Sequence, residues 1–253
     1  DEKGIEWFKT NIEKELNVTF QKPKKISEIK IIDHLGWHKQ SQDKLYLGLF
    51  IPSGRIEDRE NIKYKSGLRD VIETFKPSVT LSTDQNIILG DIEFKNQNKI
   101  ESLLGKYQID TKSPSNVNRW FLACPALPTC GLALTEAERV RDELVQNIEK
   151  ILLKLDLQNE KFSIRITGCP NGCARPYAGD IGIVGRTPGV YSLYTGGDFE
   201  GTRLNKKIFD KISYKDIPIS LEQIFLLFKK KKNEGESLGN FCNRIGSSKQ
   251  IEI

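Results

Sequence analysis

Four cysteines in two close pairs constrain this chain more than any other feature of its sequence. Cys124 and Cys130 enclose five residues, Cys169 and Cys173 enclose three, and thirty-eight residues separate the two pairs. Both loops are rich in Pro and Gly, so the backbone can bend around a compact object and offer its N–H groups to it. Thiolates gathered on a metal centre need such donors, because sulfur charge buried without hydrogen bonds is costly.

Several interpretations of the four cysteines remain open on the residues alone. Structural zinc usually takes pairs separated by two to four residues, so the five-residue loop fits zinc badly. Disulfides or plain buried thiols are the next alternative, but no secretory signal is seen, and five cysteines are an odd number. A cubane [4Fe–4S] cluster accepts irregular loops because its four corners are spread more widely than the ligands of one ion. The fifth cysteine, Cys242, stands alone, and we expect it to be a buried structural thiol.

Composition excludes several classes of protein. The 253 residues are enough to bury a core, and 38% hydrophobic with 29% charged residues is typical of a globular chain. No apolar run approaches the roughly 20 residues of a membrane span. The net charge of +5 is mild, and no continuous basic face with interleaved aromatic residues is present. We therefore expect no membrane and no nucleic acid as partners.

Hydrophobic periodicity predicts an α+β protein in which strands alternate with helices. Helical spacing is found over residues 4–16, 64–75, 94–107 and 221–228, and behind a capping-box pattern, Thr135-x-x-Glu138. Strand patterns are found over 45–51, 162–166, 180–184 and 190–194, and a strand–turn–strand pattern covers 78–92. A polar stretch from Asp110 to Asn118 reads as a linker between two units.

The cysteine motifs resemble a known family. Ala123–Cys130, followed by Thr167–Tyr177, resembles the paired cluster motif of sulfite reductase haemoproteins, in the sirohaem-dependent sulfite and nitrite reductase superfamily. Further similarity lies in Leu49–Ile56, in Leu81–Asn86 and in Gly196–Asn205. The Pro-rich first loop and the glycine before Cys173 are similar to assimilatory sulfite reductases, since nitrite reductases tend to have Ser at that position.

The resemblance implies roles for individual residues. The metal ligands of a [4Fe–4S] cluster would be Cys124, Cys130, Cys169 and Cys173. Cys173 would also be the proximal ligand of the sirohaem iron, so that its sulfur bridges the two cofactors. The other residues expected near the cofactors are Asn171, Gly172, Gln85, Asn86, Arg55 and Arg175, the two arginines for the sirohaem carboxylates.

The resemblance also implies an organisation. It predicts an N-terminal helix and connector (1–34), a ferredoxin-like half-domain (35–112) and an α/β domain that binds the [4Fe–4S] cluster and the sirohaem (113–253). Family members have two pseudo-symmetric halves in a chain about twice as long, and this chain resembles the C-terminal half. The missing N-terminal half would then carry the basic residues that bind the sulfite anion.

The implied activity is an assimilatory sulfite reductase, an enzyme that reduces sulfite to sulfide with six electrons from ferredoxin or an NADPH-dependent flavoprotein. The alternatives are a nitrite reductase of the same superfamily, a non-catalytic iron–sulfur electron-transfer module and, less favoured, a zinc-stabilised binding module. Without a signal peptide pattern after Asp1, we expect a cytoplasmic protein, or a plastid one in a plant or alga. Because the sequence has no Met, we expect a fragment or a processed form. His34 and His38 lie four residues apart, but we expect surface or packing roles for them rather than a shared metal.

Overall fold

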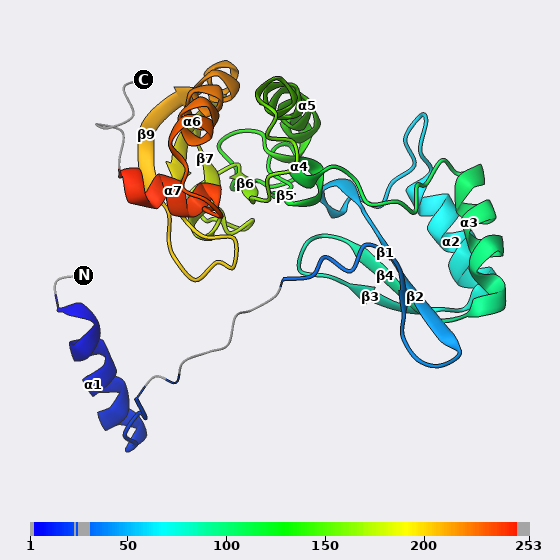
Figure 1. Cartoon of the computed structure of the whole chain (residues 1–253). Coiled ribbons are helices and arrows are strands. Elements are labelled where there is room, and N and C mark those ends of the chain that lie inside the picture. The colour runs from blue at the N-terminus through cyan, green and yellow to red at the C-terminus, as the bar shows by residue number, and fades with distance from the viewer. Residues whose placement is uncertain (1–2, 23, 25–30, 247–253) are drawn as a thin grey trace. The chain divides into compact units, whose positions relative to one another are not determined.

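The computed structural model describes residues 3–22, 24 and 31–246. The chain divides into two compact units, residues 1–31 and residues 32–253. In the smaller unit, α1 (Gly4–Leu16) is the helix that the apolar spacing predicts, and none of its residues is buried (Figure 1). Among the described residues, no helix is long and apolar enough to cross a membrane.

The larger unit begins with a four-stranded antiparallel sheet in the order β1-β2-β4-β3 (Figure 1). Its strands are β1 (Gly36–Lys39), β2 (Lys44–Leu49), β3 (Ser78–Leu81) and β4 (Ile87–Glu93). Alternate residues of a strand point to one face, so the leucines of β2 pack together with Ile87 and Leu89 of β4 on the same side. Helices α2 (Tyr64–Phe75) and α3 (Gln97–Lys106) cover that side with their apolar stripes, and the core is closed between helices and sheet.

A five-stranded sheet in the order β5-β6-β7-β8-β9 follows. Its strands are β5 (Phe121–Ala123), β6 (Ile164–Thr167), β7 (Ile181–Thr187), β8 (Val190–Thr195) and β9 (Lys206–Ser213). The first three strands are parallel to one another, and β8 and β9 are added in antiparallel fashion. Parallel neighbours need a crossover connection, and two different segments provide it here. Helix α5 (Glu138–Leu155) lies in the crossover from β5 to β6, and residues 168–180, which contain the second cysteine pair, connect β6 to β7.

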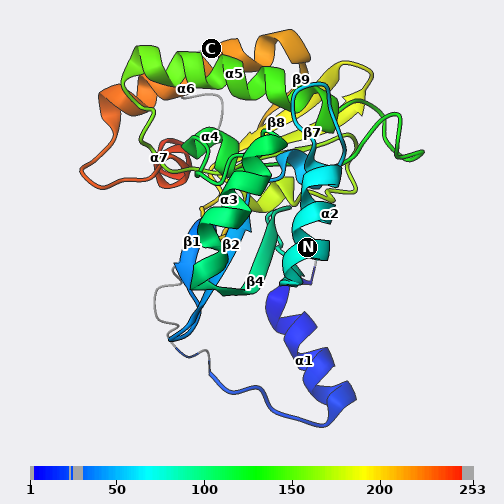
Figure 2. The same ribbon diagram turned by 90° about the vertical axis from the view of Figure 1, so that its right-hand side faces the viewer.

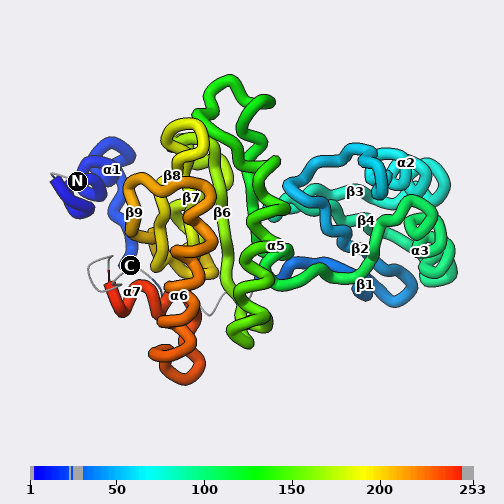
Figure 3. Tube along the Cα trace, turned by 90° about the horizontal axis from the view of Figure 1, so that it is seen from above, coloured from blue at the N-terminus to red at the C-terminus, as the bar shows by residue number. Residues whose placement is uncertain are grey.

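Two long helices cover one face of this sheet. Helix α5 and helix α6 (Ile217–Lys231) lie side by side across it, as Figure 2 and Figure 3 both show. Their buried residues, such as Leu144, Ile148 and Phe225, join the strand residues in one core. Two shorter helices complete the unit, α4 (Asn116–Arg119) before β5 and α7 (Leu238–Ile245) after α6. Among the described residues, four 3₁₀ turns accompany the helices, at Pro52–Gly54, Phe94–Asn96, Pro176–Ala178 and Tyr214–Asp216.

The structure confirms the predicted α+β class but not every local detail. The predicted capping box is wrong: α5 begins at Glu138 after Ala137, and no side chain caps it. The Thr135 hydroxyl instead donates to the Tyr191 hydroxyl and accepts the N–H of Gly189, while Glu138 pairs with Arg55. Tertiary partners have therefore displaced the local pair. Strands β1, β5 and β9 and helices α4 and α7 are additional elements, and all five have eight residues or fewer and give weak periodic signals.

Candidate functional site

The two cysteine loops begin at the same edge of the five-stranded sheet. Cys124 directly follows β5, and Cys169 lies two residues beyond the end of β6, its parallel neighbour. The Cys124 N–H donates to the Ile166 carbonyl at 3.1 Å, so the first loop leaves the sheet against the end of β6. Because carboxyl ends of parallel strands share one edge, the sheet brings together two pairs that are far apart in sequence.

Gly168 joins the two loops through its backbone. Its N–H donates to the Cys124 Sγ at 3.3 Å, and its carbonyl accepts the N–H groups of Leu134 and Thr135 at 2.8 and 3.1 Å. A Cβ at this position would lie 2.6 Å from the Thr135 carbonyl oxygen and 2.7 Å from the Ala126 Cβ. Only glycine fits here without moving the backbone of the first loop.

The thiols differ in exposure and share an electrostatic environment. Cys124 and Cys169 are buried, Cys130 is half-buried and Cys173 is exposed, and all four are free. Burial raises the pKa of the Cys124 thiol, the N–H groups of Gly168 and Ala126 oppose this, and the neighbouring Cys173 and Cys169 raise it further. Cys169 and Cys173 are therefore close enough for their charge to disfavour deprotonation of Cys124. Among the described residues, no group of three or more His, Cys, Asp or Glu side chains is arranged to hold a single metal ion.

Gln85 and Asn86 lie in the turn between β3 and β4. The Gln85 side chain pairs with the backbone of Ala123, donating to its carbonyl at 2.8 Å and accepting its N–H at 3.3 Å. Asn86 is 3% exposed, and its Oδ1 accepts the N–H of Ile51 at 3.1 Å. Its Nδ2 is buried and has no hydrogen-bond partner among the described residues. Gln85 therefore docks the four-stranded sheet on the residue before Cys124, and Asn86 keeps one buried donor unused.

Two arginines lie beside the second loop. Arg175, half exposed, donates to the Thr83 carbonyl at 3.1 Å and lies 3.8 Å from Asp84. Arg165 donates to the Arg175 carbonyl at 3.3 Å, and burial together with the nearby charge of Arg175 lowers its pKa. Within the described residues, Arg165 has no carboxylate within 4.0 Å. Asp84 and Asp180 compensate part of this positive charge, and the two neighbouring guanidiniums can still pair with an anionic group at this place.

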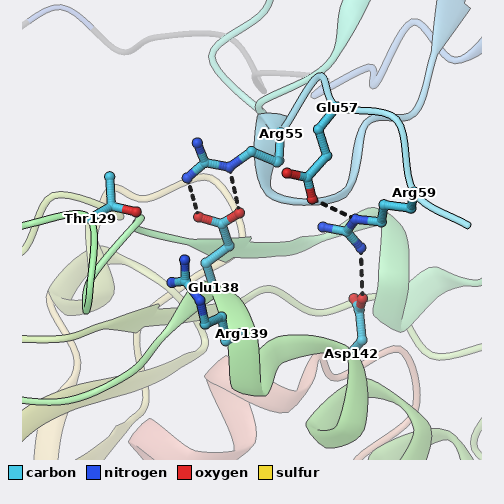
Figure 4. Close-up of a pocket in the computed structure, with 7 residues that line it drawn as sticks. All are labelled: Arg55, Glu57, Arg59, Thr129, Glu138, Arg139 and Asp142. Carbon is cyan, nitrogen blue, oxygen red and sulfur yellow. Dashed lines mark hydrogen bonds and ion pairs between the residues drawn. The ribbon is translucent and has the colours of Figure 1, made fainter. Parts of the chain in front are cut away.

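Arg55 takes part in an ion-pair network that faces the first cysteine loop (Figure 4). Its guanidinium pairs with both carboxylate oxygens of Glu138, at 2.7 and 2.6 Å, and Glu138 is only 8% exposed. Arg59 contacts Glu57 at 2.7 Å and Asp142 at 3.5 Å. A polar cavity of about 330 Å³ lies among these residues, Arg139 and Thr129, the last of which belongs to the first cysteine loop.

The structure thus places the predicted residues in three settings. The four cysteines lie on adjacent loops, with Asn171 and Gly172 between Cys169 and Cys173. Gln85 contacts the residue before Cys124, Arg175 follows the second pair, and Asn86 is buried beside Ile51, whereas the Arg55 guanidinium is engaged by Glu138. The cofactor roles assigned to these residues stay predictions.

The two histidines cluster around Tyr46. His34 is within 3.0 Å of the Tyr46 hydroxyl, and His38, on β1, stacks on the Tyr46 ring at 4.7 Å between centroids. This arrangement agrees with the packing role expected for them.

Sequence reasoning missed several residues of the site. Gly168 and Tyr177, which contacts the second loop, stood inside the quoted motif but were given no role, and Glu138 was assigned to a cap. Only the exclusion of a Cβ at Gly168 and the tertiary partners of the other two reveal what they do.

Two family models match successive parts of the chain. Residues 115–252 match the family described as the nitrite and sulphite reductase 4Fe-4S domain, and residues 38–107 match the nitrite/sulfite reductase ferredoxin-like half domain. Sulfite reductase [ferredoxin] of Synechococcus elongatus is 37% identical over 96% of this chain and 39% of its own. Sulfite reductase [NADPH] hemoprotein beta-component of Methylocella silvestris is 37% identical over 99% of this chain and 44% of its own. The chain therefore spans about two fifths of the length of these relatives.

A solved structure supports the fold. The NirA protein of Mycobacterium tuberculosis superposes with a TM-score of 0.76 over 98% of this chain and 47% of that chain, at 20% sequence identity.

Proposed function

Because the chain belongs to the family of nitrite and sulphite reductase 4Fe-4S domains, we propose that it is the cluster- and sirohaem-carrying C-terminal half of an assimilatory sulfite reductase. The proposed reaction is the six-electron reduction of sulfite to sulfide. The names of the Synechococcus and Methylocella relatives, both sulfite reductases and one a hemoprotein, support this substrate and a haem cofactor. The name of the Synechococcus relative contains ferredoxin, and the name of the Methylocella relative contains NADPH. The two kinds of electron donor therefore remain alternatives for this chain.

The observation that carries the proposal is the meeting of the two cysteine loops at Gly168. One backbone amide donates to the sulfur of the first loop and belongs to the residue that precedes the second pair. Hydrogen bonds to cluster sulfurs stabilise their negative charge and tune the reduction potential. The donor set, four thiols with a backbone N–H already directed at one of them, fits a [4Fe–4S] cluster held by Cys124, Cys130, Cys169 and Cys173.

The same edge fits a polycarboxylate macrocycle. Cys173 is the exposed member of the set, so its sulfur is accessible to a second cofactor outside the loops. Arg165 and Arg175 offer positive charge, and the buried Nδ2 of Asn86 offers an unused donor. When bound, the cluster and the sirohaem would supply the electron transfer and the reduction of the substrate. The residues of this chain hold the ligating sulfurs, compensate carboxylate charge and keep the first loop docked through Gln85.

Reconstitution tests the proposal. The purified chain is incubated anaerobically with iron and sulfide, and we expect about four iron atoms per chain and a broad brown absorption. Cys173→Ser should weaken the cluster and abolish the optical changes that added sirohaem produces. Cys242→Ser is the control, because Cys242 is buried on α7, and we expect it to keep both signals. A Cys173→Ser chain with a normal cluster and normal sirohaem spectrum would overturn the assignment.

The proposed reaction needs basic residues beyond those of this chain. Of the arginines nearest the cysteines, Arg119 is paired with Asp33 at 3.0 Å, which leaves Arg165 and Arg175 for two anionic ligands. We therefore expect the reconstituted chain, supplied with sirohaem, a reduced viologen and sulfite, to produce no sustained sulfide. Sustained sulfide production would refute the half-enzyme assignment. In the assembled enzyme, a comparison of turnover on sulfite and nitrite decides between the two reductases.

A further inference from the structure

Tyr177 makes two contacts with the second cysteine loop, one through its hydroxyl and one through its ring. It lies in the 3₁₀ turn Pro176–Ala178, just beyond Cys173, and its hydroxyl donates to the Pro170 carbonyl at 3.1 Å. This hydrogen bond joins the residue after Cys169 to the segment after Cys173. It therefore closes the loop that contains Cys173.

The Tyr177 ring also covers Gly172. A Cβ on Gly172 would lie 3.1 and 3.4 Å from two carbons of the ring, which shows how closely the ring packs on the loop. Gly172 has a φ of +72°, a conformation that residues with a side chain rarely adopt. The ring therefore packs against the point at which the loop turns back toward Cys173.

Contacts with Tyr194 and Asn205 fix the position of Tyr177. The edge-to-face contact with Tyr194 on β8 has a centroid distance of 5.3 Å and an interplanar angle of 87°. The backbone N–H of Asn205 donates to the Tyr177 carbonyl at 2.9 Å, and the Asn205 side chain donates to the carbonyls of Pro176 and Gly179 at 2.6 and 3.0 Å. The five-stranded sheet thus fixes Tyr177, and Tyr177 can transmit that rigidity to the loop.

We propose that Tyr177 is a positioning residue that holds the Pro170–Cys173 turn in the conformation in which Cys169 and Cys173 ligate one metal centre together. The inference rests on the proposed function, since it presupposes a cluster on these thiols. A ligand loop that is ordered before binding loses less conformational entropy when the metal binds. One neutral hydrogen bond contributes about 1 kcal/mol, which corresponds to a roughly fivefold change in an equilibrium.

Tyr177→Phe is the decisive variant because it removes the hydroxyl and keeps the ring. The reconstituted full chain is exposed anaerobically to an iron chelator, and the loss of cluster absorbance is followed with time. We expect Tyr177→Phe to lose its cluster about three- to tenfold faster than wild type, and Tyr177→Leu, which also lacks the ring, faster still. Tyr194→Phe is the matched control, since the Tyr194 hydroxyl makes no hydrogen bond to this loop in the described residues. It should stay within about twofold of wild type.

Two further readouts separate positioning from general stability. The melting temperature of the metal-free chain should fall by only about 2–4 °C in Tyr177→Phe, as expected for the loss of one hydrogen bond. The electron paramagnetic resonance spectrum of the reduced cluster should change only in the Tyr177 variants. A Tyr177→Phe cluster as long-lived as that of wild type would overturn the inference while leaving the proposed function intact. A much larger fall in the melting temperature of the metal-free Tyr177→Phe chain would also overturn it, because Tyr177 would then support the whole fold and not only the loop. A wild-type chain that takes up no cluster would overturn the proposed function and this inference with it.

Discussion

The Arg55–Glu138 pair should be the strongest single link between the Arg55 loop and α5. The pair is bidentate, and Glu138 is 8% exposed while the Arg55 side chain is 34% exposed. The hydrogen bond with Glu138, followed by its charge, raises the pKa of Arg55. Replacing Glu138 by Gln keeps the shape of the side chain and leaves the guanidinium without its charge partner.

The magnitude follows from this partial burial. Removing one partner of a fully buried pair costs roughly 3–5 kcal/mol, whereas an exposed pair contributes roughly 0–1 kcal/mol. With one partner nearly buried and the other about one third exposed, we expect Glu138→Gln to lower the free energy of unfolding by about 1–3 kcal/mol. The coupling energy in a double-mutant cycle with Arg55→Gln should be about 1–2 kcal/mol.

Urea unfolding of the metal-free chain, followed by circular dichroism and by fluorescence, measures these free energies if the two transitions coincide. The Arg59–Glu57 pair is the matched control. Its N–O distance is 2.7 Å, close to those of the Arg55 pair, but its side chains are 44% and 47% exposed. We expect a coupling energy under about 1 kcal/mol there. A coupling for Arg55–Glu138 no larger than the control would refute the argument that burial of Glu138 decides the strength of the pair.

Three other outcomes are expected of the metal-free chain. The bidentate arginine partner of Glu236 lowers the pKa of that carboxyl from 4.5 to about 2, so its stabilising contribution is complete above pH 4.5 and is lost as the pH falls toward 2. Acid unfolding monitored in wild type and Glu236→Gln should show a shallower acid limb in the variant. At pH 8, iodoacetamide should modify the exposed Cys173 in the folded chain and leave Cys242 unmodified. The reason is that burial raises the pKa of Cys242 to about 12. Mass spectrometry of peptides measures the modification at each cysteine. Gly168→Ala should destabilise the fold by about 2 kcal/mol or more and impair cluster uptake, because its Cβ would lie 2.6 Å from the Thr135 carbonyl oxygen. Gly131→Ala is the control, since a Cβ there meets nothing within 4 Å, and it should do neither. Equal effects of the two variants would contradict this reasoning.

The regular elements of this protein were predictable because their side-chain patterns are local. The apolar spacing in residues 4–16 and 64–75 predicted α1 and α2 with the bounds that the structure shows. The abundance of β-branched residues on both sides of Ser82–Asn86 predicted the hairpin of β3 and β4. Short strands such as β5, with three residues, carry too few positions for a period to be recognised.

The candidate site divides in the same way. The sequence by itself determined which thiols can act together, because four cysteines in two Pro- and Gly-rich loops leave few chemistries for them, and Cys242 has no partner within either motif. Only the tertiary structure decided where the long-range polar groups go. Glu138 leaves its local capping position for Arg55, 83 residues away, and Gln85 is taken up by the backbone of Ala123, 38 residues away. The physical reason is that a hydrogen-bonding side chain has several partners of similar strength, and the packing of the two sheets determines which of them is within reach.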